Sequence, residues 1–400
     1  MAADEEYGSR PWTAGLWQRT SGASLDEWRS SPNSLLQPHL KSLCSAIDAV
    51  ASATDTPEAV AATLADVLDR CDDLEFRDPA EVIAYMILHL ADRYGRVTQI
   101  LEQLFTAGHL PIRRRRLSVL EVGAGPAPAL YAVHDFYDDL TLWADTTQQK
   151  VEFAPATELR VLDRGQAWSR LLHQLSEEIG RLRQEVPTFS RAFPFGVTHP
   201  DFSGFSVIEE HVHALESKAR LITEEFDRDD EPISPGYARM LAQEEGVRAP
   251  SAYDLVIMCN FLTTRDTIEA FRKEIRDLAR SLTPGGLLVV LGSAKERYAP
   301  VWADLQQLVY GTTLRPLSMF KDPIAANSDP TRATLIRHQV RSSLSDLHYE
   351  GGSLPTKLGD PNKAYRRFPK FRAFVWKNQQ PPRRGRRPRQ LATEGSRYPK

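Results

Sequence analysis

The segment VLEVGAGPA (119–127) carries the clearest chemical signal in the sequence. Glycines directly after a strand let backbone N–H groups and the start of the next helix approach a ligand closely. A dinucleotide-binding protein places GxGxxG at this point and holds pyrophosphate on the positive end of that helix. Here Pro128 takes the third glycine position, and Glu121 precedes the first glycine by two residues. A carboxylate there is unfavourable beside pyrophosphate and suits a ligand that carries an amino group and a sulfonium.

Two later segments extend this pattern. EVGAGP (121–126), DLVIMCN (254–260) and LTPGGLLVV (282–290) resemble motifs I, IV and V of the class I S-adenosylmethionine-dependent methyltransferases. The resemblance covers roughly residues 117–292 and the last strand. It implies S-adenosyl-L-methionine as the cofactor and methyl transfer as the reaction, and it says little about the methyl acceptor.

The resemblance also implies roles for the loop residues. Glu121 would orient the amino group of the methionine part, directly or through water. Gly123 and Gly125 would let the loop pass beneath the cofactor, and Ala124 and Pro126 would line it through their backbone. The competing interpretation of Glu121 is a solvated acid at the end of a strand.

The resemblance also implies that an acid at the end of the second strand holds both ribose hydroxyls. Asp163 in LRVLDRG fits this position because a helical pattern follows at once, whereas Asp145 in LTLWAD has the better spacing from Gly125. We favour Asp163 and keep Asp145 as the alternative; Asp163 could instead simply cap the next helix. Asn260, after the fourth strand, is expected to contact cofactor or substrate, or to be a turn residue.

The sequence predicts no catalytic side chain. Cys259 has no proline neighbour of the kind that a thiol-based cytosine methyltransferase needs, and is better explained as a small buried residue. His199, His211 and His213 are too weakly placed to be assigned as a base. In-line displacement at a sulfonium methyl needs mainly alignment and desolvation, so a base is required only if the acceptor must first lose a proton.

The elements around these residues indicate an α/β fold, a Rossmann-like and mostly parallel sheet with helices on both faces. Apolar residues at three- and four-residue steps predict helices over 34–50, 54–71 and from Pro79 to Leu104, and short apolar runs predict the strands. The predicted strands cover 117–122, 159–163, 253–260, 287–291 and 371–378.

The predicted organisation has four parts. Residues 1–30 are irregular, 31–112 form a helical N-terminal region, 113–379 form the Rossmann-like domain, and 380–400 form a basic tail without apolar periodicity. Within the third part, the polar stretch 181–250 is an insertion that is either a lid or a poorly ordered loop.

Charge is segregated along the chain. Residues 363–400 contain 13 Lys and Arg against one acid, a net +12, and the whole chain is −3, which leaves −15 for residues 1–362. The tail 381–400 could contact RNA or the ribosome, or could be a solubilising segment or fold back on the acidic body. No apolar stretch reaches the length of a membrane span, the N-terminus does not read as a secretory signal, and the three cysteines are too far apart for a disulfide framework or metal site. These features predict a cytoplasmic protein without a metal.

A second resemblance lies upstream of the glycine loop. AEVIAYMILHLADRYGRVTQILEQL (80–104) before LSVLEVGAGP resembles the layout of the small-subunit ribosome-assembly methyltransferase-like family, with Tyr85, Arg93 and Tyr94 in roughly matching places. The proline of that family's motif and the metal-ligating cysteines of some members are missing. Two alternatives therefore stand beside an active methyltransferase: an assembly factor with weak or no catalysis, and, disfavoured by Glu121, a nicotinamide-dependent oxidoreductase.

Overall fold

The computed structural model describes residues 36–71, 74–111, 117–146, 156–163, 166–184, 196–199, 207–228, 233–244, 253–347 and 368–379. The α-helices are α3 (Leu36–Ser52), α4 (Pro57–Arg70), α5 (Pro79–Tyr85), α6 (Ala91–Thr106), α7 (Pro128–Thr146), α8 (Gln166–Gln184), α9 (Val207–Arg228), α10 (Pro235–Glu244), α11 (Arg265–Ala270), α12 (Arg272–Ser281), α13 (Ala299–Tyr310) and α14 (Pro330–Asp346). A π-helical turn, η1 (Met86–Leu90), joins α5 to α6, and η2 (Glu296–Tyr298) and η3 (Ser318–Phe320) are short 3₁₀ turns.

One sheet organises the described part of the chain. Its strands are β1 (Leu117–Val122), β2 (Ala156–Leu162), β3 (Gly196–His199), β4 (Tyr253–Cys259), β5 (Leu282–Ser293), β6 (Leu314–Pro316) and β7 (Phe371–Asn378). They lie in the order β3-β2-β1-β4-β5-β7-β6. The first five are parallel, and β7 runs antiparallel to both β5 and β6. The predicted α/β, mostly parallel fold is therefore confirmed.

This strand order places a switch point between β1 and β4. From β1 the chain proceeds to β2 and β3 on one side, and then returns to β4 and β5 on the other. Connections leave a doubly wound sheet in opposite directions at such a point, so a crevice forms at the carboxyl ends of the two strands. Glu121 and the glycine loop follow from β1, and Asn260 follows β4, so the topology brings both to this edge.

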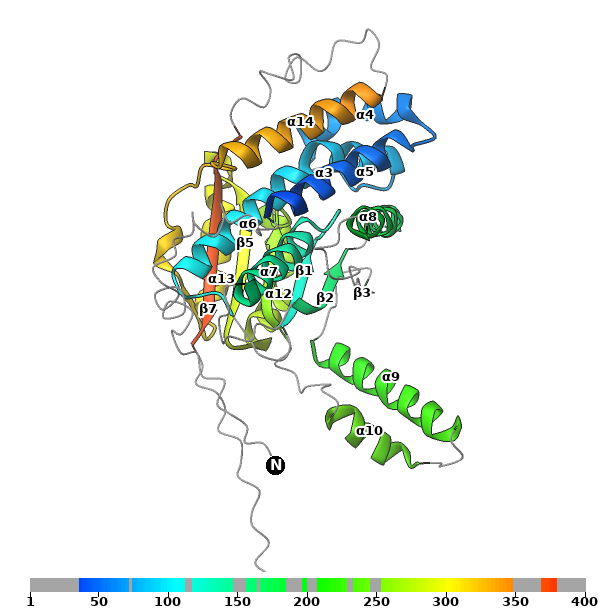
Figure 1. Ribbon diagram of the computed structural model, residues 1–400. Helices are drawn as coiled ribbons and strands as arrows, with labels where there is room; N and C mark the ends of the chain where they lie inside the picture. Colours follow the sequence, from blue (N-terminus) through cyan, green and yellow to red (C-terminus); the bar gives the residue numbers. More distant parts are fainter. Residues whose placement is uncertain are drawn as a thin grey trace, which may run out of the picture.

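The sheet is covered on both faces by helices (Figure 1). Side chains alternate along each strand, so Leu255, Ile257 and Cys259 of β4 join one core and Val256 and Met258 join the other. The first core contains α3–α8 and α14, and the second contains α11–α13. The N-terminal helices thus share a core with the sheet.

The helices and strands predicted from the sequence match the structure well near the sheet and less well elsewhere. The predicted helices match α3, α4 and the run α5–η1–α6, and all five predicted strands occur. Strand β5 begins at Leu282, earlier than the predicted strand 287–291, and its pairing with β4 shifts register between Tyr253 and Leu255. The short strands β3 and β6 were not predicted. Helices α13 and α14 were not predicted either, although the buried residues of α13, such as Val301, Leu305 and Leu308, do follow helical spacing.

The stretch 181–250 is not wholly an insertion. Helix α8 continues to Gln184, and β3 pairs in parallel with β2, so both belong to the α/β body. Helices α9 and α10 then pack on each other around a small core of their own, formed by Ala219, Ile222, Ala238 and Ala242. They project from the body in Figure 1. The lid or loop proposed for this stretch is thus confined to the segment that follows β3.

A buried charge cluster joins four helices of the first core. The Asp135 carboxylate of α7 accepts hydrogen bonds from Arg183 Nη2 of α8 at 2.7 Å and from the Tyr94 hydroxyl of α6 at 3.0 Å, and His39 Nδ1 of α3 lies 3.5 Å away. Burial alone would raise the pKa of Asp135, but the Arg183 guanidinium holds it far below its usual range. The cluster fixes α8, and with it the start of that helix beside the glycine loop.

We expect Asp135→Ala to lower the free energy of unfolding by about 3–5 kcal/mol, because it leaves the Arg183 guanidinium buried without its counter-ion. Glu178→Ala is the matched control on α8. It removes an acid that pairs with Arg181 nearer the surface, and should cost about 0–1 kcal/mol. Urea denaturation monitored by circular dichroism measures both; equal losses would contradict a structural role for the buried cluster.

Candidate cofactor site

The loop between β1 and α7 has an unusual backbone. Gly123, Gly125 and Ala127 have positive φ values of 61°, 52° and 55°, a region that favours glycine over residues with a Cβ atom. Gly123 is needed for a second reason, because an added Cβ would lie 2.1 Å from the Phe261 ring. The loop therefore turns sharply at the carboxyl edge of the sheet, as the sequence predicted.

The amide donors of this loop are already used within the protein. Gly123 N and Ala124 N donate to the Leu162 carbonyl at the end of β2, and Ala127 N donates to Ala124 O. Gly125 N donates to Asp163 Oδ2 at 2.8 Å. A phosphate-binding loop points such groups at its ligand, whereas here their bonds hold the loop itself against β2.

Glu121 caps the helix that follows the loop. Its side chain is fully buried and accepts hydrogen bonds from Ala129 N at 3.2 Å and Leu130 N at 2.9 Å, in the first turn of α7. Glu121 therefore faces the helix start and is not the solvated acid of the alternative interpretation. The positive end of α7, where a phosphate would bind, is occupied by the protein's own carboxyl group.

Burial changes the protonation of Glu121. Burial raises the pKa of this carboxyl group to about 8. The two amide hydrogen bonds act in the opposite direction but do not cancel the effect of burial. The carboxyl group is thus mainly protonated at neutral pH. A cation placed beside it would favour the ionised form, so this position suits a positively charged group of a ligand.

Asp163 and Asp145 occupy different places in the structure. Asp163 directly follows β2 and reaches the glycine loop through Gly125 N. Asp145 lies in the last turn of α7, before the β2 strand begins. The family pattern asks for an acid at the end of the second strand, and Asp163 is the residue at that position.

Asn260 follows β4 with a φ of 57°, and its backbone N donates to Leu291 O at 2.9 Å. Its Oδ1 atom is buried and has no hydrogen-bond partner within the described structure. A buried acceptor without a donor is costly. Because Asn260 sits at the switch point, this unmet acceptor favours a ligand with a donor group there.

Two aromatic rings flank the glycine loop. Phe261 packs on Gly123, and Trp168, in the first turn of α8, lies 3.6 Å from the position of a Cβ on Gly125. Neither Phe261 nor Trp168 was selected from the sequence as a site residue. The sequence feature that could have pointed to Trp168 is its position as the first large apolar residue after Asp163.

The N-terminal helices reach the same loop through further rings. Trp168 contacts Phe76 and Tyr85 with centroid separations of 5.2 and 5.4 Å, and the Arg93 guanidinium lies 4.5 Å from the Tyr85 ring centroid. The π-helical turn η1 lies between Tyr85 and Arg93, and such turns are frequent at functional sites. Of the residues that supported the second resemblance, Tyr85 and Arg93 therefore border the candidate site, whereas Tyr94 belongs to the Asp135 cluster.

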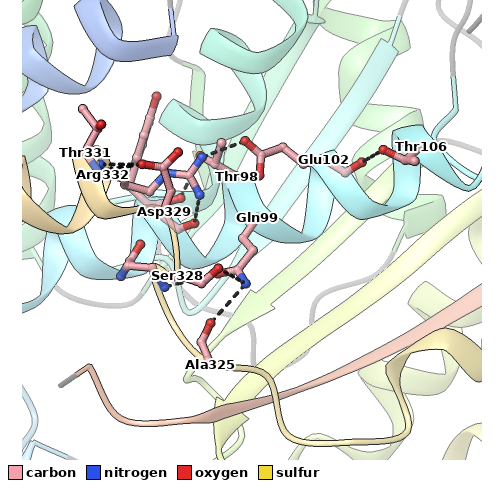
Figure 2. A network of polar contacts seen from close by, with 12 residues as sticks. Thr98, Gln99, Glu102, Thr106, Ala325, Ser328, Asp329, Thr331 and Arg332 are labelled. Carbon is pink, nitrogen blue, oxygen red and sulfur yellow. Dashed lines mark hydrogen bonds and ion pairs between the residues drawn. The ribbon is translucent and has the colours of Figure 1, made fainter. Parts of the chain in front are cut away.

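Helix α6, which carries Arg93, is fixed on its other side by the loop before α14 (Figure 2). The Gln99 amide donates to Ala325 O at 3.1 Å, and Arg332 Nη2 donates to Glu102 Oε1 at 2.7 Å. Asn327 Nδ2 donates to Asp92 Oδ1 at 2.6 Å, where Gly95 leaves room for the asparagine side chain. This network holds α6 in a set position beside the sheet.

The remaining predictions concern the basic tail, three histidines, metal binding and membrane spans. The tail 381–400 lies outside the described residues. His199 lies in β3, and His211 and His213 lie in α9. Within the part of the chain that the structure describes, no three His, Cys, Asp or Glu side chains gather in a way that could hold a metal ion. None of the described helices has the length and apolar character of a membrane span.

Comparisons with known proteins add a structural likeness. No protein-family model and no curated protein matches this chain. Among solved structures it resembles the N-methyltransferase NodS from Bradyrhizobium japonicum in complex with S-adenosyl-L-homocysteine, at 13% identity and a TM-score of 0.32, over 82% of this chain and 100% of the other.

Two further solved structures show a likeness of the same order. The arsenic(III) S-adenosylmethionine methyltransferase of Chlamydomonas reinhardtii is 12% identical, with a TM-score of 0.30, over 68% of this chain and 66% of the other. Phosphoethanolamine N-methyltransferase 2 of Haemonchus contortus is 12% identical, with a TM-score of 0.33, over 79% and 60%. Likeness at these values carries no argument about reaction or acceptor, so the function must be argued from the site.

The pH dependence of stability tests the state of Glu121. The folded pKa of about 8 lies above the ordinary value of 4.5, so the stabilising contribution of the protonated form is complete below about pH 4.5 and is lost as pH rises toward 8. Glu121→Gln cannot ionise. Its free energy of unfolding relative to wild type should therefore rise between pH 5 and pH 8, by at most about 1.4 kcal/mol per pH unit.

Urea denaturation of both proteins at several pH values measures this difference, in which the titration of all other groups cancels. A difference that is constant from pH 5 to pH 8 would show that Glu121 is ionised in the folded protein at neutral pH.

Proposed function

We propose that this protein is an S-adenosyl-L-methionine-dependent methyltransferase acting on an acceptor that its described residues do not define. The observation that supports it best lies at the switch point. There, two carboxyl groups of the protein accept hydrogen bonds from the backbone amides that would bind phosphate in a dinucleotide-binding protein. Glu121 accepts a hydrogen bond from Leu130 N in the first turn of α7, and Asp163 accepts one from Gly125 N. Such a site favours a ligand with a cationic end, such as a sulfonium nucleoside, over the anionic pyrophosphate of a dinucleotide. Both kinds of ligand carry ribose hydroxyls, so Asp163 alone does not distinguish them.

The residues at this edge fit the parts of that cofactor. Asp163 would accept hydrogen bonds from the ribose hydroxyls, Glu121 would interact with the amino group directly or through water, and Asn260 Oδ1 would accept from a donor of the cofactor or substrate. Gly123, Ala124, Gly125 and Pro126 would form the floor of the site through their backbone. Trp168 and Phe261 would supply apolar walls on either side.

Such a site would act mainly by alignment. The bound cofactor supplies a methyl group made electrophilic by the sulfonium charge. Trp168 and Phe261 would exclude water, and Asp163 and Glu121 would orient the two polar ends of the bound cofactor. No described side chain is assigned as a base, and an acceptor with a free lone pair would need none.

The assembly-factor alternative gains no support from the described residues. It depends on the tail 381–400 and on the upstream resemblance, and the first of these lies outside the description. The oxidoreductase alternative is weaker, because the amide donors that would hold a pyrophosphate are bonded within the protein.

The aspartate pair tests this proposal. Asp163→Asn keeps one acceptor for Gly125 N but loses an acceptor for the ribose diol, so the affinity for S-adenosylhomocysteine should fall about tenfold or more. Asp145→Asn is the matched control and should bind as wild type, since Asp145 lies in α7. Isothermal titration calorimetry measures both.

A wild-type chain that binds neither S-adenosylmethionine nor S-adenosylhomocysteine would overturn the proposed function. Loss of affinity in Asp145→Asn alone would instead move the ribose contact to Asp145. Gly123→Arg would not be informative, because it would clash with Phe261 whether or not a cofactor binds.

A further inference from the structure

An open cavity lies beside the candidate cofactor site, among the N-terminal helices and α8. Helix α4 packs on α5, and both α3 and α5 pack on α8, so the four helices lie together in the upper part of Figure 1. The space between them has a volume of about 790 Å³. Cavities that hold small molecules have volumes of roughly 300–1,000 Å³. The proposed function gives this space no role.

The inner walls of the cavity are apolar. They are formed by side chains of α3, α5 and α8, which include Val50, Val82, Ile83 and Leu171. Val82 and Leu171 also belong to the core of the sheet, whereas Val50 and Ile83 are only partly buried. An apolar occupant would cover these half-exposed side chains, at a gain of about 25 cal/mol for each Å² of apolar surface removed from water.

One wall of the cavity is shared with the aromatic cluster at the glycine loop. Arg77 and Ala167 line the cavity, and their chain neighbours Phe76 and Trp168 are two rings of that cluster. The Phe76 ring contacts those of Trp168 and Tyr85, with centroid separations of 5.2 and 4.9 Å. Phe76 has a positive φ of 51°, a conformation that bulky residues rarely adopt, so its packing holds this segment in place. The cavity is therefore preformed on this side and lies next to the candidate cofactor site.

The charged residues that line the cavity form its rim, and they leave an excess of negative charge. Four acids and two arginines make up the rim: Asp55, Asp78, Glu177, Glu178, Arg77 and Arg170. Arg77 Nη2 lies 2.5 Å from Glu75 Oε2, and Glu178 Oε1 lies 2.5 Å from Arg181 Nη2. Both of these partners lie outside the lining, so each pair is neutral. Three acids and one arginine remain, an excess of two negative charges.

Two further groups near the rim contribute less. The start of α4 adds a partial positive charge of about half an elementary charge, because the Thr56 side chain does not cap the helix. His173 Nε2 lies 3.2 Å from Glu177 Oε1 and adds a charge only when it is protonated. Half a charge does not offset two, so the rim attracts a cation and repels phosphate groups. RNA is therefore not the expected occupant.

We infer that this cavity is a binding site for a small amphipathic molecule with a positive charge, such as an amine on an apolar body. Asp55 and Glu177 at the rim would pair with the cation, and the apolar walls would cover the body. The inference does not depend on the proposed function, because residues other than Glu121, Asp163 and Asn260 line the cavity.

Photo-crosslinking of the full-length chain at neutral pH tests the inference with two matched probes. One probe is a phenyl diazirine that carries an ethylamine group, and the other carries a propionate group in its place. The amine should label peptides that contain Val50, Ile83 and Leu171 about threefold or more above the propionate, the effect expected for an exposed ion pair. Mass spectrometry locates and quantifies the labelled peptides, and an excess of plain phenylethylamine should suppress the labelling.

Paired variants separate the rim from general surface charge. Asp55→Asn combined with Glu177→Gln should lower the labelling by the amine about threefold or more. Asp66→Asn combined with Glu216→Gln is the matched control and should leave the labelling unchanged. It removes the same charge from acids that pair with Arg70 and Arg239 outside the cavity.

A third variant fills the cavity. Ala53 is an exposed residue of the lining, directly after α3, so Ala53→Trp would place a large ring in the space without disturbing the core. The amine should then lose its labelling of the three peptides, while circular dichroism shows the helical content of wild type.

Labelling that is spread evenly over the chain, or that is equally strong with the propionate, would overturn the inference. A folded Ala53→Trp chain that is labelled like wild type would also overturn it. If Ala53→Trp does not fold, the paired variants decide, because equal labelling of the two would show that the rim does not attract the probe.

Discussion

The contact between Glu121 and the first turn of α7 determines what the edge of the sheet can recognise. A helix start at a switch point offers free amide donors and a positive potential, and many proteins use both to bind phosphate. Here a residue of the preceding strand has taken that place, with hydrogen bonds from Ala129 N and Leu130 N. The chain must therefore reverse between Glu121 and Ala129 within a few residues. The positive φ angles of Gly123, Gly125 and Ala127 allow that reversal.

A second constraint fixes the helix that covers this edge. Helix α6 is held to α7 through Tyr94 and Asp135, and to the loop before α14 through Asp92 and Gln99. Both connections are buried and polar, so sliding the helix by one residue would leave several groups without partners. Arg93 lies between Asp92 and Tyr94, which make these connections, so its backbone position is fixed on both sides. The helix therefore places a long, otherwise flexible side chain in a defined position.

Much of the sheet could be predicted from the sequence, because buried parallel strands have a local signature of short apolar runs between turns. Glu121, Asp163 and Asn260 were likewise selected as candidates from their positions at the ends of such runs. The glycines were assigned to close approach of a cofactor, whereas the structure shows that Gly123 is already required by Phe261. Trp168 was not assigned a role at the site, because its contact with Gly125 joins segments about 40 residues apart, and Arg93 is linked to the loop only through Tyr85 and Trp168. No local pattern reports such a contact.

The sequence also divided the chain in a way that the packing does not support. A boundary between residues 112 and 113 separates helices from strands, but it places Tyr85 and Arg93 in one part and Glu121 in the other. The helices before the boundary share the core of the sheet, including Val119, Ile257 and Cys259. Removing them would expose that core and would also take away Tyr85 and Arg93, which are linked to the glycine loop through Trp168. The features that distinguish this site from a general nucleotide-binding sheet are therefore assembled across the boundary.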